Sequence, residues 1–224
     1  MNRNFFVRST LAALLLTVGV ALAKDQAAKS AGTAKEVVVK SLAIGSPAPM
    51  RGVKMKSVDG TEVSLEKAAG KNGTLVVFTC NHCPWAKMWQ TRVAAIGNAA
   101  LESGIGVVAI NSNDPADYPE DEYAPMQERA KLLGFKFPYV VDATSSVAKA
   151  FGATRTPEAF LFDAKGKLVY HGAVDDNARE EAAVKEKWLN DAVQAVATGK
   201  GVTVAETKAL GCTIKYRESN KKTS

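Results

Sequence analysis

The chain has 224 residues, of which 46% are hydrophobic, and a formal net charge of +6. This length is sufficient for one domain with a sizeable hydrophobic core. The lysines gather near the two ends of the chain and do not form a basic face interleaved with aromatic side chains. The charge therefore indicates solubilising tails, and nucleic acid is not an expected partner.

The N-terminus has the pattern of a secretory signal peptide. Arg3 and Arg8 precede an apolar run over 11–20, which is short for a bilayer-spanning helix, and a small-residue cleavage site ends at Ala23. We expect residues 1–23 to be removed, which would leave a periplasmic or secreted protein; an uncleaved membrane anchor is the alternative. Membrane contact is expected only through this export signal, because no later stretch could cross a bilayer.

The rest of the chain divides by composition into three parts. Residues 24–40 are rich in Ala, Lys and Ser without apolar periodicity, and we expect a flexible tether there. Residues 41–216 carry the regular apolar patterns of a single domain. Residues 217–224 form a short polar tail.

Within the domain, strands are expected to alternate with helices. Asp59-Gly60 lies between two short apolar stretches and indicates an N-terminal β-hairpin. Two buried strands joined by a helix are expected to run parallel, with a right-handed crossover. The later elements are expected to be a strand over 75–78, a helix over 84–101, a strand over 105–110, helices over 122–133 and 145–151 around a strand over 137–141, a hairpin over 159–163 and 167–171, and a last helix from a capping box at Asn177 and Glu180 to Thr198.

Two cysteines, Cys80 and Cys83, are separated by two residues and follow the buried strand. A strand that ends in a helix opened by this pattern places the first sulfur, that of Cys80, at the helix N-terminus. Unpaired N–H groups and the helix dipole favour a thiolate there. Because the thiolate is the form that attacks disulfides and peroxides, we expect thiol–disulfide redox chemistry.

Three further residues could support this chemistry. His82, between the cysteines, could stabilise a neighbouring thiolate and make the dithiol more oxidising. Pro84 is expected in the first helical turn, where its missing N–H costs nothing. Cys212, the third cysteine, lies near the C-terminus and is either a resolving thiol that folds back to the site or an incidental thiol.

Other polar residues have less specific interpretations. Residues 111–114 and 175–176 are interpreted mainly as turn and cap residues, and Glu120 and Asp121 as caps of the following helix, with no catalytic role. A zinc site could use Cys80, His82, Cys83 and Cys212. We do not expect one, because residues 82 and 83 are adjacent and no second Cys-x-x-Cys pair exists.

The order of elements resembles the thioredoxin fold, with Thr156-Pro157 directly before the hairpin. In that fold a cis-proline faces the disulfide, so the resemblance implies a cis bond here and a Thr156 backbone that is free to pair with an incoming chain. The implied fold class is α/β. A mixed central sheet is flanked by helices, with an N-terminal hairpin and a C-terminal tail added.

A closer resemblance is to the redoxin branch of that fold, the alkyl hydroperoxide reductase/thiol-specific antioxidant group. The chain is similar to a bacterial peroxiredoxin-like subgroup with the motif Cys-Asn-His-Cys-Pro, here residues 80–84. The similarity covers about residues 44–216, with further matching phrases at 110–114, 118–121, 155–157, 160–163, 175–177 and 211–215. Relative to peroxiredoxins, Cys80 stands at the place of a Thr or Ser, and Arg155 is not a clean match for their arginine.

The resemblance leaves two mechanisms open for one dithiol. As an exported thiol-disulfide oxidoreductase, which is our main prediction, the chain would use Cys80 as the exposed nucleophile and Cys83 as the resolving thiol. As a thiol peroxidase, it would use Cys83 to reduce hydrogen peroxide or alkyl hydroperoxides, and Cys80 or Cys212 would resolve the sulfenic acid.

A non-enzymatic interaction module is a third possibility, but a disulfide that closes so short a loop would stabilise it little. Neither redox mechanism implies an organic or metal cofactor, since the sulfurs carry the electrons. They imply protein disulfides or a peroxide as substrate, and a redox protein that recycles the dithiol.

Overall fold

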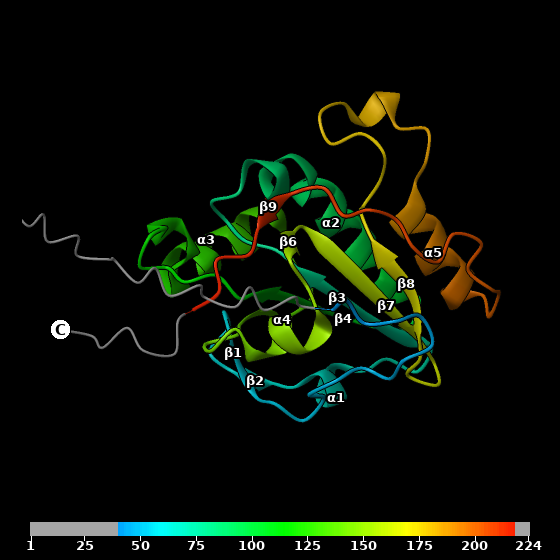
Figure 1. The fold of residues 1–224 in the computed structure, drawn as a ribbon, viewed down its shortest axis with the longest axis horizontal. Coiled ribbons are helices and arrows are strands. Elements are labelled where there is room, and N and C mark those ends of the chain that lie inside the picture. Colours follow the sequence, from blue (N-terminus) through cyan, green and yellow to red (C-terminus); the bar gives the residue numbers. More distant parts are fainter. Residues whose placement is uncertain (1–39, 218–224) are drawn as a thin grey trace, which may run out of the picture. The chain divides into compact units, whose positions relative to one another are not determined.

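The computed structural model describes residues 40–217 (Figure 1). These residues belong to one compact unit, Val38–Ser224. The predicted signal peptide, the predicted tether up to residue 39 and residues 218–224 of the predicted tail lie outside the described residues. Within the described part, no helix combines the length and the apolar character that a membrane span requires.

A mixed sheet of seven strands forms the centre of the described residues (Figure 1). The central strands β3 and β4 pair in parallel, and β7 pairs antiparallel with the other side of β3. The spatial order is β2 (Glu62–Val63), β1 (Met55–Ser57), β5 (Tyr139–Val141), β4 (Ile105–Asn111), β3 (Gly73–Phe78), β7 (Glu158–Asp163) and β8 (Leu168–Gly172). The predicted N-terminal hairpin, parallel central pair and second hairpin are confirmed.

Helices cover both faces of the sheet. On one face lie α2 (Pro84–Glu102), α3 (Tyr123–Leu133) and α5 (Trp188–Ala197), and on the other lie α1 (Leu65–Ala68) and α4 (Ser146–Phe151). Successive β3 residues enter different cores, because side chains alternate along a strand. Leu75 packs in the core that contains Trp89, whereas Val76 packs in the core that contains Phe151. Burial on both faces explains the continuous apolar sequence of β3.

The predicted start of the last helix is wrong. The side chain of Asn177 accepts hydrogen bonds from the N–H groups of Arg179 and Glu180, but these close a local turn and no helix follows. A short 3-10 helix, η2 (Glu181–Ala183), comes next, and α5 begins only at Trp188. An Asn side chain can cap a turn as well as a helix, so the capping pattern alone did not place the boundary.

The Thr156–Pro157 peptide bond is cis, as the resemblance implies. A second, two-stranded sheet lies beside it, in which β6 (Arg155–Thr156) pairs with β9 (Cys212–Thr213). The expectation that Thr156 has a free backbone is therefore wrong, because Cys212 is its antiparallel partner. In Figure 1 the C-terminal segment, in red, runs back beside β6. The whole is an α/β thioredoxin-like fold with a C-terminal segment that returns to the cis-proline.

Candidate active site

The two cysteines lie in the turn between β3 and α2, at the carboxyl edge of the central strands. Helix α2 begins at Pro84, and Cys83 is its N-cap residue. The sequence-based placement of Cys80 at the helix N-terminus is therefore wrong by three residues. The unpaired N–H groups of the first helical turn are those nearest Cys83, so the helix dipole favours a thiolate on the second cysteine.

Both sulfurs face Thr156, the residue before the cis-proline. Sγ of Cys80 lies 3.3 Å from Oγ1 of Thr156, and Sγ of Cys83 lies 3.3 Å from the Thr156 carbonyl oxygen. Cys80, Cys83 and Ala86 form a small buried cluster, and Cys212 and Trp85 pack against it. All three cysteines are free thiols in this structure.

The expectation that Cys80 is exposed is not met in this conformation. Only 5% of Cys80 and 0% of Cys83 is accessible to solvent. The side chains of Trp85 and Cys212 contribute to this cover. A protein substrate could reach the sulfurs only after part of that cover moves.

The reduced cysteines share their protons unequally. The pKa of Cys83 is well below its usual value because the Cys80 thiol donates to it; burial opposes this, and the Cys212 thiol and the Ala86 N–H add to it. The same contact with Cys83 raises the pKa of Cys80, and burial and the Asp121 carboxylate raise it further. Cys83 therefore carries the charge of the reduced pair. When Cys83 ionises, its sulfur no longer donates a hydrogen bond to the Thr156 carbonyl. It still accepts hydrogen bonds from the Cys80 and Cys212 thiols and from the Ala86 N–H.

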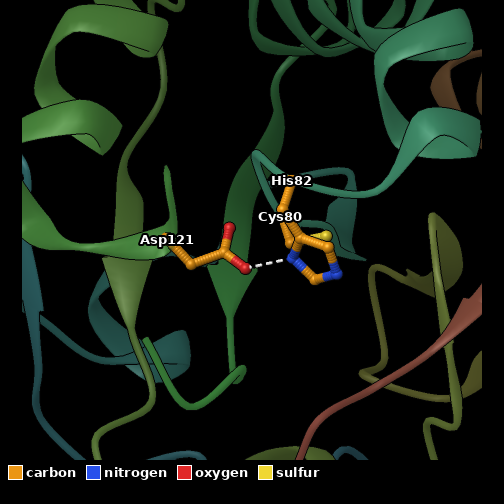
Figure 2. Close-up of side chains that lie close together, drawn as sticks. All are labelled: Cys80, His82 and Asp121. Atoms are coloured by element: carbon orange, nitrogen blue, oxygen red, sulfur yellow. Dashed lines mark hydrogen bonds and ion pairs between the residues drawn. The ribbon is translucent and has the colours of Figure 1, made fainter. Parts of the chain in front are cut away.

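His82 is held from the opposite side by Asp121. Nδ1 of His82 lies 2.5 Å from the Asp121 carboxylate, and Figure 2 shows the two side chains pointing toward each other with Cys80 close to the ring. The ring also stacks on Tyr118, with centroids 3.9 Å apart. These two contacts fix the orientation of the imidazole between the cysteines.

Asp121 is a site residue that the sequence reading missed. It was expected to cap the following helix, but it is buried and accepts hydrogen bonds from the Asn81 N–H at 2.6 Å and from the side chains of Asn111 and Asn113. Asn111 and Asn113 were interpreted as turn residues, and both are buried in this network. Their position directly after β4, at the edge where α/β sites are built, was the available signal.

The structure brings together a different set of metal-type donors from the one considered in the sequence. Among the described residues, donor atoms of Cys80, His82 and Asp121 lie within 4.8 Å of one another. The Asp121 carboxylate and Nδ1 of His82 are already engaged with each other, and Asp121 has three further donors. This arrangement is a hydrogen-bond network that orients His82 and places a negative charge near Cys80.

The remaining candidate residues are Pro84, Pro157 and Cys212, and Arg155 lies beside them. Pro84 occupies the first turn of α2, and Pro157 lies directly after Thr156, which contacts both sulfurs. Cys212 is brought to the site by β9. Arg155 is exposed, and its guanidinium donates to the Gly211 carbonyl at 3.3 Å.

Two solved structures resemble this chain over most of its length. A hypothetical protein, SMc02350, from Sinorhizobium meliloti 1021 is 34% identical with a TM-score of 0.74, and the match covers 80% of this chain and 98% of that one. An uncharacterized conserved protein from Geobacillus kaustophilus is 36% identical with a TM-score of 0.73, with 80% and 94% covered.

A curated relative has a named activity. The thiol-disulfide oxidoreductase ResA of Halalkalibacterium halodurans is 23% identical over 129 residues, which are 57% of this chain and 69% of that protein. The sequence model of the redoxin family matches residues 43–187. Because that match spans well over half of the chain and includes both cysteines and the cis-proline, the protein belongs to the redoxin family.

Proposed function

We propose that this oxidoreductase of the redoxin family reduces or forms disulfides through Cys80 and Cys83. One observation carries the proposal: both sulfurs lie 3.3 Å from atoms of Thr156, at the start of α2 and beside the cis-proline. Two sulfurs that share one neighbour in this way are placed to bond to each other or to a third sulfur. The name of the curated relative, thiol-disulfide oxidoreductase, supports the same chemistry.

In the reducing direction, Cys83 makes the first attack. Its thiolate bonds to one sulfur of a substrate disulfide, and the other substrate sulfur leaves and takes up a proton. Cys80 then loses its proton and attacks Sγ of Cys83, which closes the Cys80–Cys83 disulfide and releases the second substrate thiol. Two electrons pass to the substrate, and a recycling redox protein returns them. This assignment reverses the order expected from the sequence, because the N-cap sulfur holds the charge.

Peroxide reduction at Cys83 is a second candidate. A thiolate with no exposed surface, set at the start of a helix, is better suited to a small oxidant than to a protein chain. The Cys83 thiolate would attack one peroxide oxygen to give a sulfenic acid, and water or an alcohol would leave. Cys80 would then condense with the sulfenic acid and release water.

One set of rapid-mixing experiments tests both candidates. Reduced wild-type protein, Cys80→Ser and Cys83→Ser are mixed with a model disulfide and with hydrogen peroxide. We expect Cys80→Ser to keep the fast first step with the disulfide, whereas Cys83→Ser loses it. A fast step that survives in Cys83→Ser and is lost in Cys80→Ser would overturn the assignment of Cys83. Peroxide reaction no faster than that of an ordinary thiol would remove the second candidate.

A structural disulfide without turnover remains the alternative from a different class. It predicts that reductant destabilises the protein and that disulfide reduction does not depend on either cysteine. We expect the opposite for turnover: insulin reduction should require both Cys80 and Cys83. Insulin turbidity measured with each single serine variant decides between the two.

We also propose that the protein is exported. The support is the basic start, the apolar run over 11–20 and the cleavage site at Ala23. Expression of the full chain in a bacterium with a periplasm, followed by fractionation and N-terminal sequencing, tests this. We expect a periplasmic protein that begins at Lys24. A chain that keeps Met1 and remains in the membrane or cytoplasm would contradict the proposal.

A further inference from the structure

The backbone edge beside the cis-proline is occupied by the chain itself. Thr156 pairs with Cys212 and Arg155 with Thr213 in antiparallel register. The Ile214 N–H donates to the Thr154 carbonyl at 2.9 Å, so the pairing continues past β9. A substrate that binds by adding a strand at this edge would have to displace β9.

The C-terminal segment is built to approach this edge closely. A side chain at Gly211 would place its Cβ 2.1 Å from the Thr156 carbonyl oxygen, which no real contact allows. On the other side of β9, the Lys215 N–H donates to the Asn113 side chain at 2.8 Å, and the Lys215 carbonyl accepts from the Asp114 N–H at 2.7 Å. Gly211 therefore allows the close approach to Thr156 before Cys212, and the hydrogen bonds of Lys215 hold the chain after it.

The register places a third sulfur beside the first two. Thr156 contacts Sγ of both Cys80 and Cys83, and Cys212 lies opposite Thr156 in the ladder. Cys212 packs against the cluster of the other two cysteines. Its thiol hydrogen-bonds to Cys83, while burial and that contact raise its pKa, so in the reduced protein it is a neutral donor.

We propose that Cys83 has two alternative disulfide partners, Cys80 and Cys212, and that the Cys83–Cys212 disulfide is a second oxidised form of the site. The inference rests on the proposed function, which supplies the Cys80–Cys83 disulfide. Cys212 loses its proton to solvent and attacks Sγ of Cys83. The bond from Cys83 to Cys80 breaks, and Cys80 leaves as a thiolate that takes up a proton. One disulfide replaces another, so no further oxidant is required.

The second disulfide would change what the site can accept. It would join β9 covalently to the start of α2 and keep Thr156 paired with its own chain. Strand addition by a substrate chain would then be blocked, while Cys80 would be returned to the thiol form. The Cys80–Cys83 form leaves β9 held only by hydrogen bonds and packing, so a substrate chain can compete for the edge.

The Cys80→Ser variant isolates the second pair. The full-length variant is reduced, then treated with oxidised glutathione under native conditions, and its disulfides are mapped by tryptic peptide mass spectrometry. We expect glutathione to add to Cys83 and then be displaced by Cys212, which gives a cross-linked peptide pair. The Cys80→Ser/Cys212→Ser variant should retain the bound glutathione. Glutathione that remains on Cys83 in Cys80→Ser, with Cys212 free, would overturn the inference.

A glycine substitution tests whether β9 positions Cys212. In the Cys80→Ser background, Gly211→Ala should push β9 from Thr156 and slow cross-linking by about tenfold or more, because the effective concentration of Cys212 falls. Gly201→Ala is the matched control, since its Cβ would meet nothing within 4 Å. Equal cross-linking in both variants would refute the positioning by β9. Circular dichroism melting confirms that both variants are folded.

The two proposals fail in distinguishable ways. Wild-type protein that reduces insulin, together with a Cys80→Ser variant that forms no Cys83–Cys212 link, would refute the second disulfide and leave the proposed function standing. A Cys83–Cys212 link in Cys80→Ser, together with wild-type protein that never closes Cys80–Cys83, would refute the proposed function. It would also refute the exchange step, which needs that first disulfide.

Discussion

The Asp121 carboxylate lies 2.5 Å from Nδ1 of His82, and this contact joins the loop after β4 to the turn that carries the two cysteines. The same carboxylate accepts the N–H of Asn81, which is also between the cysteines. Its negative charge raises the pKa of Cys80. Asp121 therefore shapes the turn and keeps the proton of the reduced pair on the first sulfur.

Asp121→Asn should weaken both effects. Loss of the charge lowers the pKa of Cys80. The Asn81 N–H and the Asn111 and Asn113 side chains lose a charged acceptor, which we expect to cost about 1–3 kcal/mol of unfolding free energy. Urea unfolding measures the second effect, and thiol titration in a Cys83→Ser background measures the first.

Asp59→Asn is the matched control for this change. Asp59 is an exposed residue that accepts hydrogen bonds from Thr61 in the N-terminal hairpin, far along the chain from the cysteines. We expect it to leave the titration of Cys80 unchanged. If Asp121→Asn behaved like Asp59→Asn in the thiol titration, the electrostatic role of Asp121 would be wrong.

The thiolate of the reduced protein should belong to Cys83. Because its donors lower the pKa of Cys83, thiolate absorbance at 240 nm should persist at a pH well below the usual cysteine range of about 8.5. Cys83→Ser should remove this low-pH absorbance, and Cys80→Ala should shift it to higher pH because the thiol that donates to Cys83 is lost. Low-pH absorbance that survives in Cys83→Ser would assign the charge to another sulfur.

The same pKa shift makes the stability of the reduced protein depend on pH. A group whose pKa is lowered by folding stabilises the fold fully above its unfolded pKa, and the contribution is lost as pH falls through its folded pKa. The reduced protein should therefore lose stability relative to Cys83→Ser as the pH is lowered from about 8.5 toward the lowered pKa of Cys83. Denaturant midpoints measured across that range test this. A stability difference that does not change with pH would contradict the shift.

Sequence patterns predicted the parts of the site that depend on short stretches of neighbouring residues. The apolar run of β3 and the spacing of Cys80 and Cys83 located the dithiol, since a doubly covered strand and a Cys-x-x-Cys turn are both local signals. The start of the helix at Pro84 was also predicted. The error was to place Cys80 at the helix N-terminus, because the N–H groups of a helix that begins at Pro84 lie nearest Cys83.

Two long-range contacts of the site, Asp121 with His82 and Cys212 with Thr156, could not be predicted from the sequence. Asp121 precedes a helix, so it has the local pattern of a cap, and only the path of the loop after β4 turns it toward His82. Strand β9 has two residues and no periodicity, so nothing local indicates that Cys212 pairs with Thr156. Both contacts bring together residues that are far apart along the chain.

The Cys80–Cys83 couple should be more oxidising than thioredoxin. Stabilisation of the Cys83 thiolate favours the reduced form, which raises the reduction potential above about −270 mV. Equilibration with glutathione buffers, analysed in the Cys212→Ser variant to exclude the second disulfide, gives the potential of this pair. A value at or below that of thioredoxin would show that the thiolate is not stabilised relative to the disulfide.

The buried pair of Arg92 and Asp175 should be important for stability. The Arg92 guanidinium on α2 bonds the Asp175 carboxylate and also the carbonyl oxygens of Asn177 and Ala178, so it ties the helix to the loop after β8. Asp175 also accepts from the indole N–H of Trp89 at 2.7 Å. Removal of either partner leaves the other buried and without its opposite charge.

Arg92→Ala and Asp175→Ala should each cost about 3–5 kcal/mol of unfolding free energy, since an unpaired buried charge is strongly unfavourable. The exposed pair of Lys54 and Glu62 provides the control, because Lys54→Ala should cost no more than about 1 kcal/mol. Urea unfolding of the three variants and the wild type gives the comparison. Equal losses in Arg92→Ala and Lys54→Ala would mean that the buried pair does not hold α2 against the loop, and the packing of this face would have to rest on the apolar contacts of Trp89 and Val93.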